Sequence, residues 1–113
     1  PLACVVFVSG GAVAEAADAN RLGAALRRAG RESDVLGRLS RDEFVVVAPG
    51  TGEAGASRLA ERLAAALAPD LADLGLTLRS GVSAVEDAAA ARVDEQELLV
   101  RAAGRAREGP SLN

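Results

Sequence analysis

Polar residues with suggestive types and spacing are concentrated between Arg31 and Gly50. Arg31 and Asp34 form an R-x-x-D pair, and the acidic pair Asp42 and Glu43 follows it. The apolar sequence F-V-V-V-A comes directly after the acidic pair and is typical of a strand. Nowhere else does so much polar chemistry lie against so clear a strand. Both pairs also have a structural interpretation, because Asp34 could cap a turn and the acidic pair could be a polar hairpin turn.

The residue types that the chain lacks exclude several common active sites. The sequence contains no His, which removes the commonest general base and the commonest metal ligand. The single cysteine, Cys4, lies in an apolar run that is typical of a buried core thiol. One cysteine also excludes an internal disulfide and a cysteine-built zinc site. The stretch Ser9-Gly10-Gly11 lacks the Lys and Ser or Thr of a phosphate-binding loop, so we expect a plain turn there.

Length, charge and hydropathy limit the remaining classes. At 113 residues the chain is long enough for one domain with a buried core. Its net charge of −3 argues against a nucleic-acid-binding surface. No apolar run approaches the roughly 18 residues of a transmembrane helix, and no signal peptide is evident, so we expect a cytoplasmic domain without membrane insertion. Because the sequence starts at Pro1, we expect residues 1–113 to be a single domain excised from a longer protein.

Hydrophobic periodicity predicts the elements that position the candidate site. Short apolar or alternating runs predict strands at residues 2–8, 35–39, 43–48 and 76–85. Helical spacing of small apolar residues predicts helices at residues 11–30, 53–68 and 94–107. We expect Pro69 to stop the second helix, a loop at residues 70–75, and Asp94 to cap the third helix. Gly81 is typical of a bulge or a close-packing point in the last strand.

The order of these elements indicates the fold class. Strand, helix, hairpin, helix, strand and a last helix give an α+β fold with a β-α-β-β-α-β core, an antiparallel sheet and a terminal helix. This is the ferredoxin-like or palm arrangement. Strands that are apolar at nearly every position need cover on both sheet faces. We therefore expect one sheet face or one helix face to meet a partner, either a second copy of the chain or a neighbouring domain.

Several stretches together resemble the GGDEF domain of bacterial diguanylate cyclases. The main one is D-V-L-G-R-L-S-R-D-E-F-V-V-V-A-P-G-T, which is followed by A-S-R-L-A-E-R-L. L-T-L-R-S-G-V-S-A is similar to a later strand of the family, and L-L-V-R-A-A-G-R-A-R-E-G to its last helix. The resemblance extends from Asp34 to Gly109 and implies the fold that the element order predicts.

The resemblance also implies how the catalytic signature has changed. The family joins two GTP molecules into cyclic di-GMP with the help of metal ions, and two glycines bring the hairpin close to the nucleotide. In this chain Ser40 and Arg41 replace those glycines. Asp42 and Glu43 match the acidic pair, which in the family supplies a metal ligand and a candidate base, and Phe44 completes the signature.

Other parts of the family's active site have no counterpart. Val8 and Gly10 stand where the family has metal-binding aspartates, and neither side chain can bind a hard cation. The segment that holds guanine is shortened, and Ala106 stands near the position of a phosphate-binding lysine. We therefore expect an inactive domain with no catalytic residue, no metal and no cofactor, although an active cyclase is an alternative.

The R-x-x-D pair corresponds to the family's inhibitory site, which binds cyclic di-GMP. Arg31 and Asp34 stand at the family's distance from the signature. A guanidinium can pair with guanine O6 and N7, and a carboxylate can accept from guanine N1–H and N2–H. Arg38 could assist the ligand phosphates or form a solvated face with Arg41. The resemblance thus favours a cyclic di-GMP receptor in nucleotide signalling, and the alternative is a ligand-free module for dimerisation or domain packing.

Overall fold

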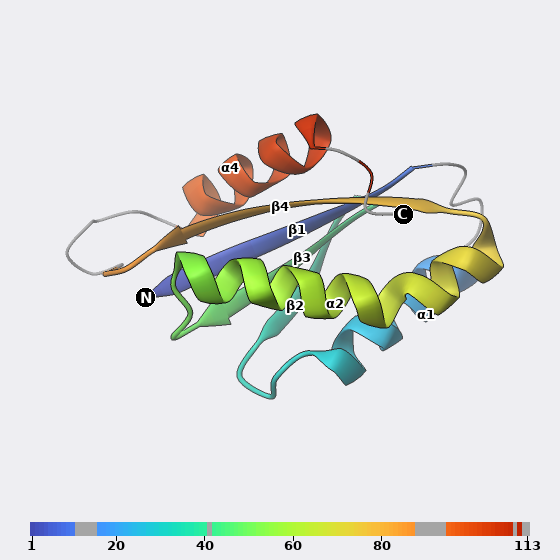
Figure 1. The fold of residues 1–113 in the computed structure, drawn as a ribbon, viewed down its shortest axis with the longest axis horizontal. Coiled ribbons are helices and arrows are strands. Elements are labelled where there is room, and N and C mark those ends of the chain that lie inside the picture. Colours follow the sequence, from blue (N-terminus) through green and yellow to red (C-terminus); the bar gives the residue numbers. More distant parts are fainter. Residues whose placement is uncertain (11–15, 41, 88–94, 110, 112–113) are drawn as a thin grey trace.

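A computed structural model describes residues 1–10, 16–40, 42–87, 95–109 and 111. The elements follow in the order β1 Leu2–Gly10, α1 Ala16–Ala29, β2 Val35–Ser40, β3 Glu43–Pro49, α2 Glu53–Leu74, β4 Thr77–Val85 and α4 Glu95–Glu108 (Figure 1). This order confirms the predicted α+β class and the β-α-β-β-α-β core with a terminal helix. Residues 11–15 of the predicted first helix and the predicted cap Asp94 lie outside the described residues.

The strands form one antiparallel sheet in the order β2-β3-β1-β4. The apolar strand β1 lies in the interior of the sheet, between β3 and β4. It continues beyond the predicted end, because Ser9 and Gly10 pair with Leu78 and Thr77 of β4. The prediction of a plain turn at Ser9-Gly10 is therefore wrong, and Gly11 lies outside the described residues.

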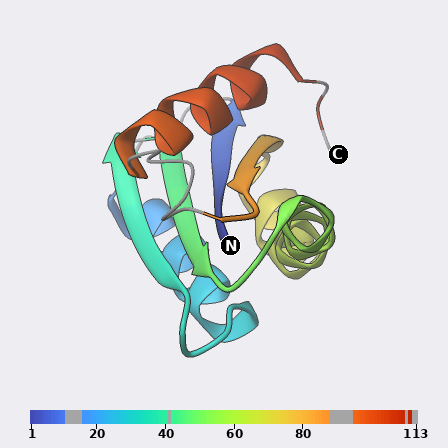
Figure 2. The ribbon, with the colours of Figure 1, turned by 90° about the vertical axis from the view of Figure 1, so that its left-hand side faces the viewer.

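Helices lie on both faces of this sheet (Figure 2). One buried cluster joins α1 and α2 to the sheet face that carries Phe7 and Phe44, which pair across β1 and β3. The second cluster packs Leu98 and the alanines of α4 against the opposite face, where Cys4 is fully buried. The burial of Cys4 and Phe44 confirms both as core residues. Among the residues that the structure describes, the large apolar side chains that remain exposed are Val35, Leu39 and Val100.

Helix α2 is longer than its sequence predicts. It passes through Pro69 and ends at Gly75, whose φ of 66° lies in the left-handed region that favours glycine. The predicted stop at Pro69 and the predicted loop at residues 70–75 are therefore wrong. Two tertiary interactions hold the turn after the proline. Leu71 is buried, and Arg21 of α1 pairs with Asp70 at 2.5 Å and with the neighbouring Asp73 at 2.6 Å.

The α1–α2 ion pairs also affect the arginine itself. Hydrogen bonds to Asp73 and then to Asp70 raise the pKa of the Arg21 guanidinium above its ordinary value. Because an arginine guanidinium keeps its charge in proteins, the connection between α1 and the end of α2 depends on the two carboxylates.

Helix α4 lies directly against β4 at Gly81. A Cβ atom added to Gly81 would lie 2.2 Å from the carbonyl oxygen of Ala102 and 2.4 Å from the amide nitrogen of Ala106. This confirms Gly81 as a close-packing point. Ser83 Oγ donates to the Leu98 carbonyl at 2.5 Å, and Arg105 donates to the Val82 carbonyl at 2.6 Å. These contacts fix α4 on the face that carries the acidic pair of the signature.

Candidate functional site

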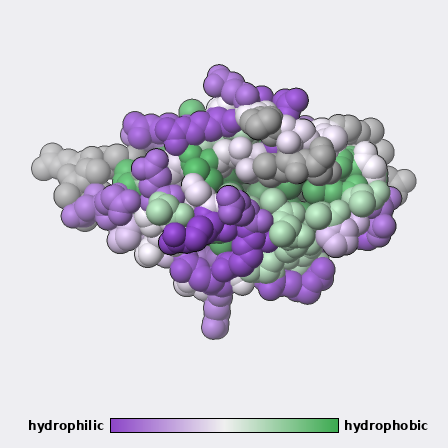
Figure 3. Space-filling view, viewed as in Figure 1, coloured by the Kyte–Doolittle hydropathy of each residue, from purple (hydrophilic) through white to green (hydrophobic). Residues whose placement is uncertain are grey.

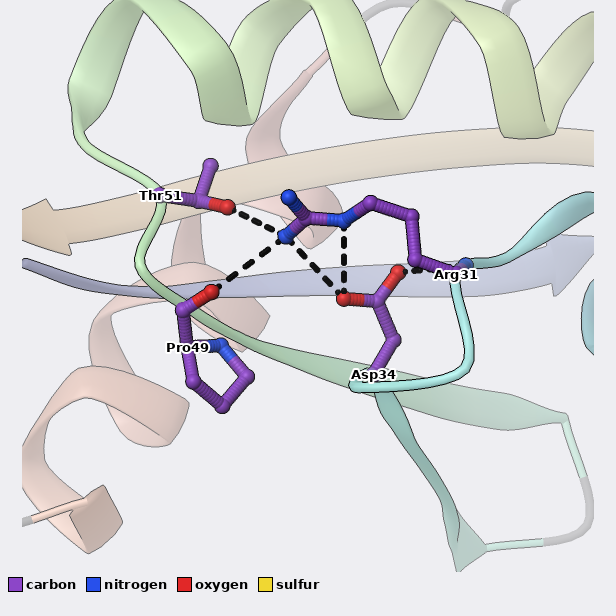
Figure 4. Close-up of polar contacts among 4 residues, drawn as sticks. All are labelled: Arg31, Asp34, Pro49 and Thr51. Carbon is purple, nitrogen blue, oxygen red and sulfur yellow. Dashed lines mark hydrogen bonds and ion pairs between the residues drawn. The ribbon is translucent and has the colours of Figure 1, made fainter.

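The loop between α1 and β2 carries the R-x-x-D pair. Helix α1 closes with a hydrogen bond from the Gly30 N–H to the Leu26 carbonyl at 2.9 Å. The Asp34 N–H then donates to the Arg31 carbonyl at 3.0 Å, which forms a tight turn before β2. The structure thus brings the side chains of Arg31 and Asp34 together, as Figure 4 shows.

The Asp34 carboxylate is buried, and both of its oxygens accept hydrogen bonds from Arg31. Its side chain is only 4% exposed. Oδ2 accepts from the Arg31 backbone N–H at 2.9 Å, and Oδ1 accepts from Arg31 Nε at 3.3 Å and from Arg31 Nη2 at 3.2 Å. Asp34 therefore both caps the turn and orients the Arg31 guanidinium.

The Arg31 guanidinium joins this loop to the loop that precedes α2. Nη2 donates to Thr51 Oγ1 at 2.6 Å and to the Pro49 carbonyl at 3.3 Å (Figure 4). The Arg31 side chain is 44% exposed. Among the described residues, Nη1 has no hydrogen-bond partner. Arg31 thus presents one free N–H₂ group to solvent from a fixed position.

Arg31 lines a pocket of about 510 Å³ at the start of α2. Two further arginines, Arg58 and Arg62, line the pocket one helical turn apart. The remaining lining consists of Gly50, Thr51, Gly52, Gly55 and Leu59. We call this pocket the arginine pocket. In Figure 3 strongly hydrophilic side chains cover the N-terminal half of α2, whereas its C-terminal half is pale and apolar.

Sequence reasoning missed Arg58 and Arg62. Their spacing of four residues on the side of α2 opposite its buried leucines was a visible signal, because it places both on one exposed helix face. Nothing in the sequence showed that this face would lie beside Arg31.

Arg38 does not line the arginine pocket. Its Nε donates to the Ser40 carbonyl at 3.0 Å, and its guanidinium lies 5.7 Å from the centre of the Phe44 ring. It lines a separate cavity of about 200 Å³ with Arg27 and Asn20. The structure therefore separates Arg38 from the two residues with which the sequence grouped it.

The altered signature forms a closed polar cluster at the β2–β3 turn. Ser40 Oγ lies 2.9 Å from Asp42 Oδ1 and 3.0 Å from Glu43 Oε1. Glu43 also forms a 2.8 Å ion pair with Arg107 of α4. Arg41, the other residue that replaces a glycine of the signature, lies outside the described residues. The carboxylate of Glu43 is therefore balanced by a cation of the same chain.

The donor set beside Glu43 does not fit a hard cation. Val8 is the direct neighbour of Glu43 in the β1–β3 ladder, and Gly10 pairs with Thr77. Neither Val8 nor Gly10 has an oxygen ligand in its side chain. Across the part of the chain that the structure describes, His, Cys, Asp and Glu form no group of three that could hold a metal ion. Within the same part, no helix is long and apolar enough to span a membrane.

The model of the family described as "Diguanylate cyclase, GGDEF domain" matches residues 19–85. The chain belongs to the GGDEF family. The match contains both the R-x-x-D pair and the altered signature. Membership of the GGDEF family associates the chain with cyclic di-GMP signalling.

A solved structure shows the same fold. The chain is similar to a crystal structure of a DGC protein from Thermotoga maritima, with a TM-score of 0.55, 18% identity, and coverage of 89% of this chain and 77% of that one. It also matches PelD 156–455 from Pseudomonas aeruginosa PA14, apo form, with a TM-score of 0.48, 20% identity, and coverage of 86% and 41%. No curated protein matches the chain. The Thermotoga structure supports the cyclase-like fold of the GGDEF domain described above.

Proposed function

We propose that this GGDEF domain is a catalytically inactive receptor that binds cyclic di-GMP in the arginine pocket. The observation that carries the proposal is the convergence of Arg31, Arg58 and Arg62 on one pocket. The described lining contains no carboxylate, so it favours an anionic ligand. A volume of about 510 Å³ lies within the range of pockets that hold small-molecule ligands. Asp34 completes the site by holding Arg31 in place.

Loss of catalysis is supported by the closed state of the signature. Glu43 is paired with Arg107, and its neighbour in the sheet is Val8 rather than a second carboxylate. Two-metal phosphoryl chemistry needs several oxygen ligands around the metal ions, and the described residues form no group of three His, Cys, Asp or Glu that could hold a metal ion. Incubation with GTP and Mg²⁺ or Mn²⁺ should give no cyclic di-GMP. Steady product formation would contradict the inactive assignment.

Calorimetry with cyclic di-GMP tests the receptor proposal. Wild-type protein should release or absorb heat at micromolar nucleotide, and Arg62→Ala should weaken binding by about tenfold, because it removes one of the three cations of the pocket. Arg62 lies on the surface of α2 and takes no part in the α1–β2 loop, so its loss should leave the fold intact.

Two further variants complete this test. Arg31→Ala should abolish binding, although it also leaves the buried Asp34 carboxylate without its cation. Arg28→Ala removes an exposed arginine of α1 that does not line the pocket, so it should bind like wild type. Absence of heat from the wild type would reject the receptor proposal.

Exposed apolar side chains support a second candidate, a ligand-free interaction module. Leu39 and Val100 line one cavity of about 280 Å³ beside Leu99 and Ala103, and Val35 is exposed on the same edge strand as Leu39. Such a surface fits a second copy or a neighbouring domain. Sedimentation of the isolated domain as a concentration-dependent dimer, together with silent calorimetry, would favour this candidate over the receptor.

A further inference from the structure

We infer that the outer edge of β2 is a docking surface for an extended segment of a partner protein in which apolar and acidic residues alternate. The segment adds a strand to the sheet beside β2. Its apolar side chains lie on the α4 side of the sheet, and its carboxylates lie on the α1 side. None of the residues that carry this inference lines the arginine pocket, so the surface is independent of the proposed receptor function.

The outer edge of β2 is open to a further strand. Strand β2 is the last strand of the sheet, and among the described residues only β3 pairs with it (Figure 2). Every second residue of such a strand directs its backbone N–H and C=O away from the sheet. Proline, several charges or a central bulge often protect an edge of this kind. Strand β2 has no proline and one charged residue, Arg38, and its irregularity lies between Arg38 and Ser40, beside the turn.

The α4 side of this edge is apolar. Val35 and Leu39 are 59% and 40% exposed, and Val100 of α4 is 65% exposed. Val35 lies on this side because its neighbour in β3, Val47, packs against the α4 cluster. Leu39 lies there as well, because it lines a cavity of about 280 Å³ together with Val100. Apolar side chains of an added strand would cover these three residues.

The α1 side of the same edge is positively charged. Leu36 and Arg38 face this side, because their neighbours in β3 belong to the core under α1 and α2. Both residues line a cavity of about 200 Å³ with Arg27 of α1, and the described lining contains no carboxylate. Arg27 and Arg38 are exposed. Since successive side chains of a strand point to opposite faces, an alternating apolar and acidic segment matches both sides of the edge.

The same charges disfavour a second copy of the chain as the occupant. Two β2 strands paired in antiparallel fashion about a two-fold axis would place Arg38 of both copies on one face of the joined sheet. Like charges at neighbouring cross-strand positions are destabilising. An acidic segment brings the opposite charge to the same place.

Fluorescence anisotropy with labelled synthetic peptides tests the inference on the wild-type protein without nucleotide. A peptide of alternating Val and Glu should bind at micromolar concentration and lose affinity as salt is raised. A peptide of alternating Val and Lys should not bind. A Val–Glu peptide with a central proline lacks a backbone donor and should bind about tenfold more weakly. Equal binding of the acidic and basic peptides, or no binding of the acidic one, would overturn the inference.

Point variants locate the bound peptide. Arg27→Ala should weaken binding of the Val–Glu peptide by about two- to fivefold, the range of an exposed ion pair. Its matched control is Arg28→Ala, which removes an exposed arginine of α1 that does not line this cavity and should bind like wild type. Leu39→Ser should also weaken binding, and because Leu39 is exposed the fold should persist. Unchanged affinity in both Arg27→Ala and Leu39→Ser would contradict the proposed location.

Amide hydrogen exchange shows whether the peptide adds a strand. Binding should slow exchange at alternate residues of β2 and leave β4, the opposite edge of the sheet, unchanged. Protection at β4 alone would overturn the inference. A dimer in sedimentation that Leu39→Ser abolishes would overturn it as well, because a second copy would then occupy the edge. None of these measurements involves cyclic di-GMP, so the inference and the receptor function can fail separately.

Discussion

At the scale of single residues, the site depends on how Arg31 is held. Asp34, Thr51 and Pro49 all accept hydrogen bonds from its guanidinium, so two loops of the chain fix one charged group. Preorganisation of this kind lowers the conformational entropy that a ligand must overcome. The same contacts make the R-x-x-D pair a structural connection in the absence of ligand, so the two interpretations of these residues are compatible.

Thr51 provides a residue-scale prediction. Its hydroxyl accepts from Arg31 at 2.6 Å, and the residue is buried. Thr51→Val keeps the shape but removes the acceptor, so it should lower the free energy of unfolding by about 1–3 kcal/mol and weaken cyclic di-GMP binding. Denaturant unfolding and calorimetry measure the two effects. Thr51→Ser keeps the hydroxyl and should retain affinity; a Thr51→Ser variant as weak as Thr51→Val would show that the hydrogen bond is not the cause.

How far the site could be predicted differs from residue to residue. The R-x-x-D spacing correctly indicated two residues that lie together, because residues three positions apart meet across one tight turn. The burial of Asp34 could not be predicted, since it depends on the loop at Pro49 and Thr51 closing over Arg31. Arg58 and Arg62 were missed for the same reason, because their partner is distant in the sequence.

At the scale of elements, α4 and β4 are joined through a close approach that only glycine permits. Gly81 has no room for a Cβ atom, because the backbone of α4 lies where it would be placed. The neighbouring hydrogen bonds from Ser83 and Arg105 to backbone carbonyls bring the two elements together. Helix α4 also supplies Arg107, which forms an ion pair with Glu43 of the altered signature. The packing of α4 on β4 therefore places the cation that balances the Glu43 carboxylate.

Two glycine substitutions test this element-scale account with opposite expected signs. Gly81→Ala should destabilise the domain by about 1–3 kcal/mol or more, because the clash is with backbone that cannot rotate away. Gly104→Ala, inside α4 with no atom within 4 Å of its added Cβ, should stabilise it by about 0.5–1 kcal/mol. Chemical denaturation measures both. Equal effects of the two substitutions would contradict the close packing of α4 on β4.

The elements themselves were predictable where local and tertiary preferences agree. Apolar β-branched runs identified the interior strands, and the order of elements indicated the fold. Pro69 was misjudged because buried Leu71 and the Arg21 ion pairs continue the helix through a residue that usually ends one. Ser9 and Gly10 were misjudged because pairing with β4 extends a strand beyond its apolar residues.

At the scale of the whole molecule, the two faces of the sheet carry different parts of the family's machinery. The face under α4 holds Glu43, Val8 and Arg107, which form the closed remains of the signature. The start of α2, on the opposite side, holds the arginine pocket. The proposed loss of catalysis and the proposed ligand binding concern different sites, because the two sites share no side chain.

The location of the bound nucleotide tests this account most directly. Two-dimensional NMR of the labelled domain, titrated with cyclic di-GMP, reports which backbone amides change their environment. We predict shifts at Arg31, at residues 50–55 and along the first turns of α2 up to Arg62, with the amides of α4 and of the β2–β3 turn unchanged. Shifts centred on Asp42, Glu43 and the end of β1, or no shifts at saturating nucleotide, would contradict the account.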